Sequence, residues 1–113
     1  MHEMSLAENV LQIIEDAAHT GQFQRVRTVV LEIGALAAVE PDAMRFCFDA
    51  VTRGSIAEGA QLEIVETPGA GRCTACGATL VLLEPYGLCP ECGSGRIEIM
   101  SGKQMRVMDL NVE

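Results

Sequence analysis

The chain has 113 residues, of which 49% are hydrophobic and only 4% aromatic, and its net charge is −8. This length allows one compact domain, or a small domain with a metal-stabilised lobe, built on an aliphatic core. The acidic balance disfavours nucleic-acid binding, and no apolar run approaches the ~18 residues of a membrane-spanning helix. The first residues also lack a signal-peptide pattern, so we expect a cytoplasmic protein whose cysteines stay reduced.

The first predicted element is a helix from Ser5 to about His19. Ser5-Leu6-Ala7-Glu8 matches a capping box, in which Ser5 is the N-cap and Glu8 the third helical residue. Gly21 marks the C-terminal end. The apolar residues that follow the box recur at helical spacing, and they are Val10, Ile13, Ile14 and Ala17. On this interpretation, the residues from Met1 to Met4 form a short arm outside the helix.

The next segments predict an α+β fold. Residues Arg25 to Ile33 are rich in β-branched side chains and predict a strand that ends at Gly34. A second helix is predicted to begin near Pro41 and to end at Gly54. Its apolar stripe consists of Met44, Cys47, Phe48 and Val51. Cys47 lies on that stripe, so we interpret it as a core side chain and not as a reactive thiol.

The remaining segments predict two more strands around an inserted lobe. Gln61 to Thr67 forms the second strand, and Pro68-Gly69-Ala70-Gly71 is expected to be a flexible joint. Within the lobe, an apolar run from Leu80 to Leu83 precedes a turn expected at Tyr86-Gly87. The tail from Met105 to Val112 alternates apolar and polar residues, as a half-buried strand does.

The tail has no strand partner within the lobe, so we expect it to return to the first two strands. The chain would then hold a small domain of two helices and three strands, formed by residues 1–69 plus 103–113. Residues 70–102 would form a zinc-ribbon-like lobe inserted into that domain.

The strongest motif is a pair of cysteine knuckles, Cys73-Thr74-Ala75-Cys76-Gly77 and Cys89-Pro90-Glu91-Cys92-Gly93. Two such pairs at this spacing predict one tetrathiolate metal site, and the glycine after each pair can adopt the positive φ of a knuckle. Zinc is favoured, with rubredoxin-like iron as the competing metal. Four protein ligands close the coordination shell, so the metal is expected to be structural.

A second candidate metal site is His2, because its position next to the chain start changes its chemistry. The α-amine of Met1 and the amide and imidazole nitrogens of His2 can form fused chelate rings, and the amide of Glu3 can add a further nitrogen. A plane of nitrogens suits Cu(II) or Ni(II) better than zinc. The other histidine, His19, is distant in sequence, and neither imidazole has a recognisable catalytic partner. We therefore predict that the protein is not an enzyme.

The combination of an initial Met1-His2-Glu3 with the two cysteine knuckles past residue 70 resembles the HypA/HybF family of nickel metallochaperones for [NiFe]-hydrogenase maturation. The resemblance covers the whole chain. It implies that His2 is the essential nickel ligand and that Cys73, Cys76, Cys89 and Cys92 hold structural zinc. It also implies a nickel domain and a zinc domain. The implied partners are a GTPase of the same maturation pathway and the hydrogenase large-subunit precursor.

Two other functions fit the motifs taken alone. One is a zinc-ribbon module that contacts a protein or RNA partner, with His2 incidental. The other is an electron carrier with iron in the tetrathiolate, which would absorb strongly in the visible region, whereas zinc is colourless. Metal analysis after dialysis against nickel distinguishes the first of these from a nickel carrier.

Overall fold

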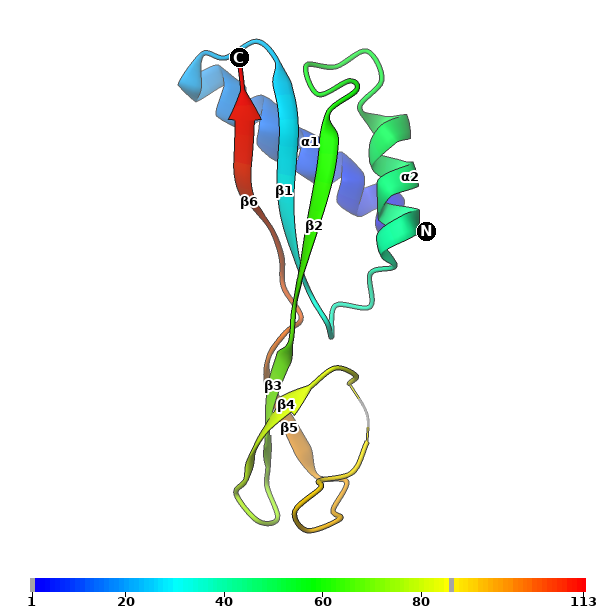
Figure 1. Cartoon of the computed structure of the whole chain (residues 1–113), viewed down its shortest axis with the longest axis vertical. Coiled ribbons are helices and arrows are strands. Elements are labelled where there is room, and N and C mark those ends of the chain that lie inside the picture. Colours follow the sequence, from blue (N-terminus) through cyan, green and yellow to red (C-terminus); the bar gives the residue numbers. More distant parts are fainter. Residues whose placement is uncertain (1, 86) are drawn as a thin grey trace. The chain divides into compact units, whose positions relative to one another are not determined.

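The computed structural model describes residues 2–85 and 87–113, and it has the α+β architecture predicted from the sequence (Figure 1). The described part of the chain forms two compact units. The first contains the described residues up to Leu31, together with Val39–Val65 and Arg106–Glu113. The second contains Glu32–Ala38 and Glu66–Met105. The short segment Glu32–Ala38 therefore groups with the cysteine-bearing residues, although it lies far from them in sequence.

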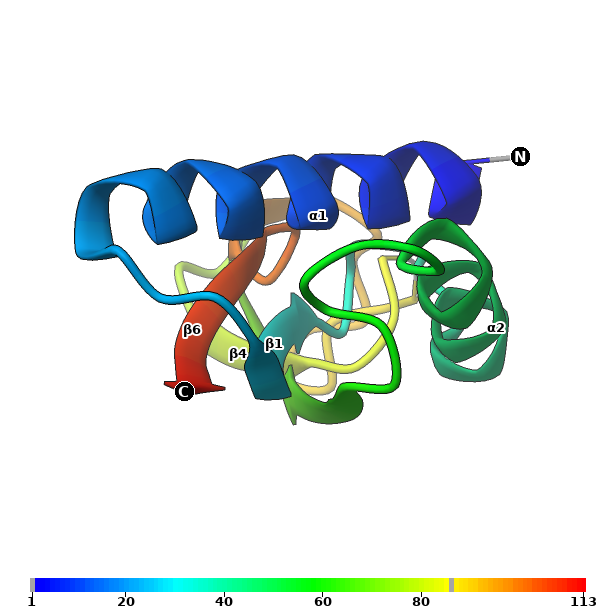
Figure 2. The ribbon, with the colours of Figure 1, turned by 90° about the horizontal axis from the view of Figure 1, so that it is seen from above.

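The first unit is built on a mixed sheet of three strands with two helices, in which the final strand runs opposite to the other two (Figure 1). The strands β1 (Val26–Gly34), β2 (Gln61–Thr67) and β6 (Met105–Val112) lie in the order β2-β1-β6. The return of the final strand to the first two is thus confirmed. Helix α1 (His2–Gly21) lies across one face of the sheet, and its N-terminal end is close to α2 (Pro41–Val51) (Figure 2).

The core of this unit is aliphatic, as the low aromatic content predicts. Helix α1 presents Ala7, Val10 and Ile14 at helical spacing, and all three are fully buried. The other buried hydrophobic residues of this unit are Val26, Val29, Leu31, Met44, Cys47, Phe48, Ala57 and Leu62. The apolar stripe predicted for the second helix is therefore buried at Met44, Cys47 and Phe48.

Helix α1 differs from its prediction at the N-terminal end. The helix begins at His2, so the capping box at Ser5 and the arm from Met1 to Met4 are wrong for the described residues. The physical reason is tertiary: the Glu3 carboxylate accepts a hydrogen bond from the backbone N–H of Glu40, 3.2 Å away. This contact fixes the first turn against α2, and an acidic side chain there also suits the helix dipole. Met1 lies outside the described residues.

Helix α2 begins as predicted, with Pro41 as its first residue. Glu40 is the N-cap, and its side chain accepts a hydrogen bond from the backbone N–H of Ala43 at 3.0 Å. The helix ends at Val51, three residues before the predicted Gly54. Thr52 is the C-cap, and both its N–H and its hydroxyl donate to the carbonyl of Phe48.

The second unit holds a smaller antiparallel sheet in the order β4-β3-β5. Its strands are β3 (Gly69–Cys73), β4 (Thr79–Leu82) and β5 (Ile97–Ser101). The flexible joint predicted at Pro68–Gly71 is wrong, because Gly69 to Gly71 are paired with β4, and Ala70 and Gly71 are also paired with β5. The turn predicted at Tyr86-Gly87 rests on Tyr86, which lies outside the described residues.

Three glycines in the second unit allow backbone segments to cross in direct contact. The N–H of Gly34 donates to the carbonyl of Gln104, and the N–H of Leu36 donates to the carbonyl of Gly102, both at 2.8 Å. A Cβ at Gly34 would collide with the Gly102 carbonyl, and a Cβ at Gly102 would lie 2.5 Å from the Cα of Gly69. The joint at Gly69 was expected to be flexible, but the close approach of the Gly69 and Gly102 backbones makes both of them tightly packed positions instead.

We expect Gly34→Ala to destabilise the second unit by about 2–4 kcal/mol, because the added methyl group meets backbone atoms and not a movable side chain. The measurement is urea unfolding, together with limited proteolysis of residues 66–105. Gly95→Ala is the matched control, since its Cβ would meet only the Leu88 side chain at an ordinary 3.7 Å. Equal stability of the two variants would contradict the crossing described for Gly34.

Candidate metal centres

The two cysteine pairs converge on one centre in the second unit. The Sγ atoms of Cys73, Cys76, Cys89 and Cys92 all lie within 4.8 Å of one another. The Sγ atoms of Cys73 and Cys92 are 3.5 Å apart, and those of Cys76 and Cys89 are 3.7 Å apart. Among the described residues, this is the one group of His, Cys, Asp or Glu side chains arranged to hold a metal ion.

The two knuckles have the same backbone pattern, which aims both sulfurs of each pair at the centre. The N–H of Gly77 donates to the carbonyl of Cys73 at 2.7 Å, and the N–H of Gly93 donates to that of Cys89 at 2.8 Å. Both glycines have the positive φ expected from the sequence, 80° and 76°. The Cys73 N–H also bonds to the carbonyl of Ala78, which closes the first knuckle onto the start of β4.

The crowded thiols have very different proton affinities. The backbone N–H of Cys76 stabilises the Cys73 thiolate and lowers the pKa of Cys73 to about 7. At Cys92 the N–H of Ser94 acts in the same direction, but the sulfur of Cys73 and desolvation outweigh it and raise the pKa to about 12. Without a cation among the sulfurs, the crowding at Cys92 therefore favours its protonated form.

The donor set and its spacing fit zinc. A tetrahedral zinc with Zn–S bonds of about 2.3 Å separates its sulfur ligands by about 3.8 Å, close to the two short Sγ–Sγ distances. Soft thiolates suit zinc, and a dication supplies the charge that the four sulfurs need. The buried apolar side chain beside Cys73 and Cys89 is Leu80, with Ala78, Leu82 and Ile97 packed around it. This core is small, so the lobe depends on its metal for stability.

His2 occupies the first turn of α1, in the first unit. Its side chain is 53% exposed, so the imidazole is accessible to a metal ion from solution. The first four N–H groups of a helix have no acceptor within the helix, so the amide nitrogens of His2 and Glu3 are not committed to the hydrogen bonds of α1. The α-amine of Met1, the third nitrogen of the predicted chelate, lies outside the described residues.

Sequence reasoning missed the role of the Glu3 side chain. Its carboxylate is only 13% exposed, accepts the Glu40 N–H, and has Oε2 at 3.8 Å from Nδ1 of His2. The hydrogen bond from Glu40 is the largest cause of a lowered pKa for Glu3. No local pattern could reveal this contact, because it joins residues 37 positions apart.

Cys47 is placed where the sequence predicted it, buried on α2 and apart from the cysteine cluster. We expect Cys47→Ala to leave the nickel and zinc content unchanged and to lower the free energy of unfolding by about 1 kcal/mol, through a small cavity. Metal analysis and urea unfolding of the variant check both parts. Loss of either metal would show that Cys47 is a ligand.

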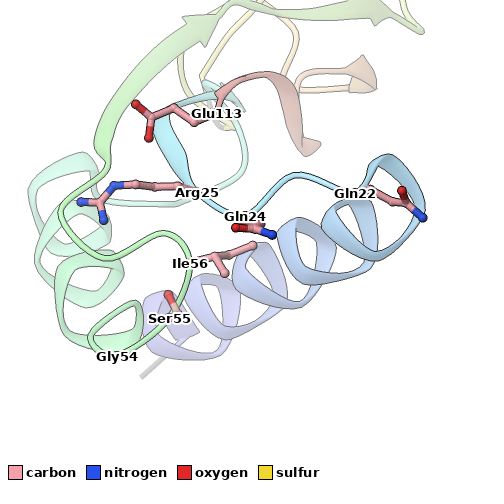
Figure 3. Close-up of a pocket in the computed structure, with 7 residues that line it drawn as sticks. All are labelled: Gln22, Gln24, Arg25, Gly54, Ser55, Ile56 and Glu113. Atoms are coloured by element: carbon pink, nitrogen blue, oxygen red, sulfur yellow. The ribbon is translucent and has the colours of Figure 1, made fainter.

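A hollow of about 770 Å³ in the first unit has no metal-binding character (Figure 3). It lies past the C-terminal end of α1, and a helix of 20 residues places that end about 30 Å from His2. The lining residues are Gln22, Gln24, Arg25, Gly54, Ser55, Ile56 and Glu113. With neither cysteine nor histidine, this lining offers no soft donor and no imidazole base. His19 is exposed in the last turn of α1 and is not among the lining residues.

The fold and the two sites together define a two-unit α+β protein with a closed tetrathiolate centre and an accessible histidine at the start of its first helix. The family model described as hydrogenase/urease nickel incorporation, metallochaperone, hypA, matches residues 1–112. The chain belongs to the HypA family of nickel metallochaperones for hydrogenase maturation.

Similar proteins support this assignment over the full length. The chain is 57% identical to the hydrogenase maturation factor HypA of Albidiferax ferrireducens and 55% identical to that of Dechloromonas aromatica, and each alignment covers 100% of both chains. The solution structure of the nickel metallochaperone HypA from Helicobacter pylori matches with a TM-score of 0.70 at 25% identity. That match covers 97% of this chain and 96% of the other.

Proposed function

We propose that this protein carries Ni(II) to a [NiFe]-hydrogenase during assembly, and that His2 provides the imidazole that holds the metal. The observation that carries the proposal is the exposed His2 at the start of α1 in a member of this family. The amide nitrogens of His2 and Glu3 support it, because they have no acceptor within the helix and nickel can bind them without breaking a helical hydrogen bond. The Met1 amine is proposed as a further donor.

A site at an exposed helix start suits a carrier. A competing protein can reach the nickel there and remove it, whereas a buried site would have to open first. We propose residues 1–69 plus 103–113 as the nickel-binding domain and residues 70–102 as the zinc-binding domain.

In that zinc-binding domain, Cys73, Cys76, Cys89 and Cys92 would hold zinc with no open position for a substrate. We therefore propose a carrier and not an enzyme.

The partners proposed are a GTPase of the maturation pathway and the precursor of the hydrogenase large subunit, both in the cytoplasm. No helix within residues 2–85 and 87–113 is long and apolar enough to cross a membrane. The negative net charge supports protein partners over nucleic acid.

The test is complementation of a bacterial strain that lacks its own HypA-family gene. Wild-type protein should restore the nickel content of the purified hydrogenase large subunit, and His2→Ala should not. His19→Ala is the matched control, because it removes the other exposed imidazole of the same helix. Full nickel loading by His2→Ala would refute the proposed role of His2.

A further inference from the structure

We infer that Glu3 is a positioning residue for nickel: its carboxylate ties the first turn of α1 to the start of α2 and so fixes the place of the His2 imidazole. This inference rests on the proposed function of His2. It assigns to the Glu3 side chain a role different from that of a ligand.

The hydrogen bond between Glu3 and Glu40 is suited to act as a tether, that is, to restrain the first turn of α1 against the start of α2. Glu3 accepts the backbone N–H of Glu40 at 3.2 Å, and its carboxylate is largely shielded from solvent. Glu40 in turn is the N-cap of α2, where its own side chain accepts the Ala43 N–H. The N–H that Glu3 binds therefore belongs to a residue whose backbone is already held by a helix. A donor on a flexible side chain would hold the Glu3 carboxylate less firmly than this backbone N–H does.

The same carboxylate faces His2. Oε2 of Glu3, the atom that accepts the Glu40 N–H, lies 3.8 Å from Nδ1 of His2. With Oε2 committed to the backbone, Glu3 restrains the turn that carries the imidazole and both amide nitrogens. A metal site loses affinity when its ligands must first be ordered, so a pre-ordered first turn strengthens nickel binding.

The experiment compares Glu3→Ala, Glu3→Gln and Glu8→Ala in the full chain with zinc bound. Gln keeps a side-chain oxygen that can accept the Glu40 N–H, whereas Ala removes it. Glu8 is an exposed acidic residue of the same helix and controls for the loss of a charge. Two quantities are measured: exchange of the Glu40 amide proton by NMR without nickel, and the nickel dissociation constant by titration.

We expect Glu3→Ala to speed exchange of the Glu40 amide about tenfold and to weaken nickel binding at least about tenfold. Glu3→Gln should stay within about threefold of wild type in both, and Glu8→Ala should change neither. Unchanged Glu40 exchange in Glu3→Ala would overturn the tether.

Two further results would also overturn the inference. One is nickel affinity unaffected by Glu3→Ala. The other is a Glu3→Gln variant that loses nickel while Glu40 stays protected, which would make the carboxylate a ligand or an essential charge. Failure of the proposed function looks different, because His2→Ala would then retain nickel while the Glu40 exchange results stayed as expected.

Discussion

Replacing Cys73 with Ala is expected to abolish zinc binding and to unfold the cysteine-bearing lobe, while the first unit stays folded. Cys73 is fully buried and, with Leu80 and Cys89, makes up the small core of the lobe, so its loss removes a ligand and a core side chain together. Zinc binding supplies on the order of 10–16 kcal/mol in small zinc-dependent folds, far more than this core can replace. Zinc content by mass spectrometry and limited proteolysis of residues 72–100 measure the two effects.

The first unit provides the internal control for this variant. Its buried residues belong to α1, α2, β1 and the segments that follow α2, and none of them is a member of the cysteine cluster. Helical circular dichroism should therefore persist when the lobe becomes sensitive to protease. A variant lacking both Cys73 and Cys92 that still held one zinc per chain would disprove a shared tetrathiolate.

Replacing His2 with Ala is expected to weaken nickel binding by more than about 100-fold, without change in zinc content or helical signal. The imidazole is exposed, and its charged neighbour among the described residues, the Glu3 carboxylate, lies 3.8 Å away, beyond hydrogen-bond distance, so we expect its removal to act on the metal and not on stability. Titration calorimetry of the zinc-loaded chain measures the affinity. Wild-type affinity should also fall on acidification, because nickel binds nitrogen donors in their deprotonated form and its binding releases protons.

Two further titrations probe the donor set of this site. A chain extended by a few residues before Met1 should lose tight binding if the Met1 amine is a donor, and unchanged affinity would exclude that amine. Cu(II) should bind more tightly than Ni(II), and Ni(II) more tightly than Co(II), as nitrogen ligands generally order these metals. Selectivity for nickel would then come from partners and metal availability.

Much of the fold could be predicted because its signals are local. The helix start at Pro41, the strand Gln61–Thr67 and the final strand agree with periodicity and turn residues. The spacing of the cysteine pairs likewise predicted their convergence, since each knuckle is a short backbone motif with its own hydrogen bonds and glycine.

The errors fall where distant residues decide the local structure. The capping box at Ser5 was overridden because Glu3 finds its partner at Glu40, so the helix extends to His2. Gly69, which was expected to lie in a flexible joint, packs against Gly102, and only residues without a Cβ allow the crossing of Gly34 and Gly102. Neither contact produces a periodic pattern in the sequence, because each joins residues that only the folded chain brings together.

We propose that one chain binds nickel and zinc at separate sites, and counting both metals in the same sample tests this proposal. Wild-type, His2→Ala and His19→Ala proteins are dialysed against equal nickel and zinc, freed of loosely bound ions, and analysed by mass spectrometry. We expect one nickel and one zinc per chain for wild type and His19→Ala, and zinc alone for His2→Ala. One nickel retained by His2→Ala, beside a full complement of zinc, would show that His2 does not hold the nickel.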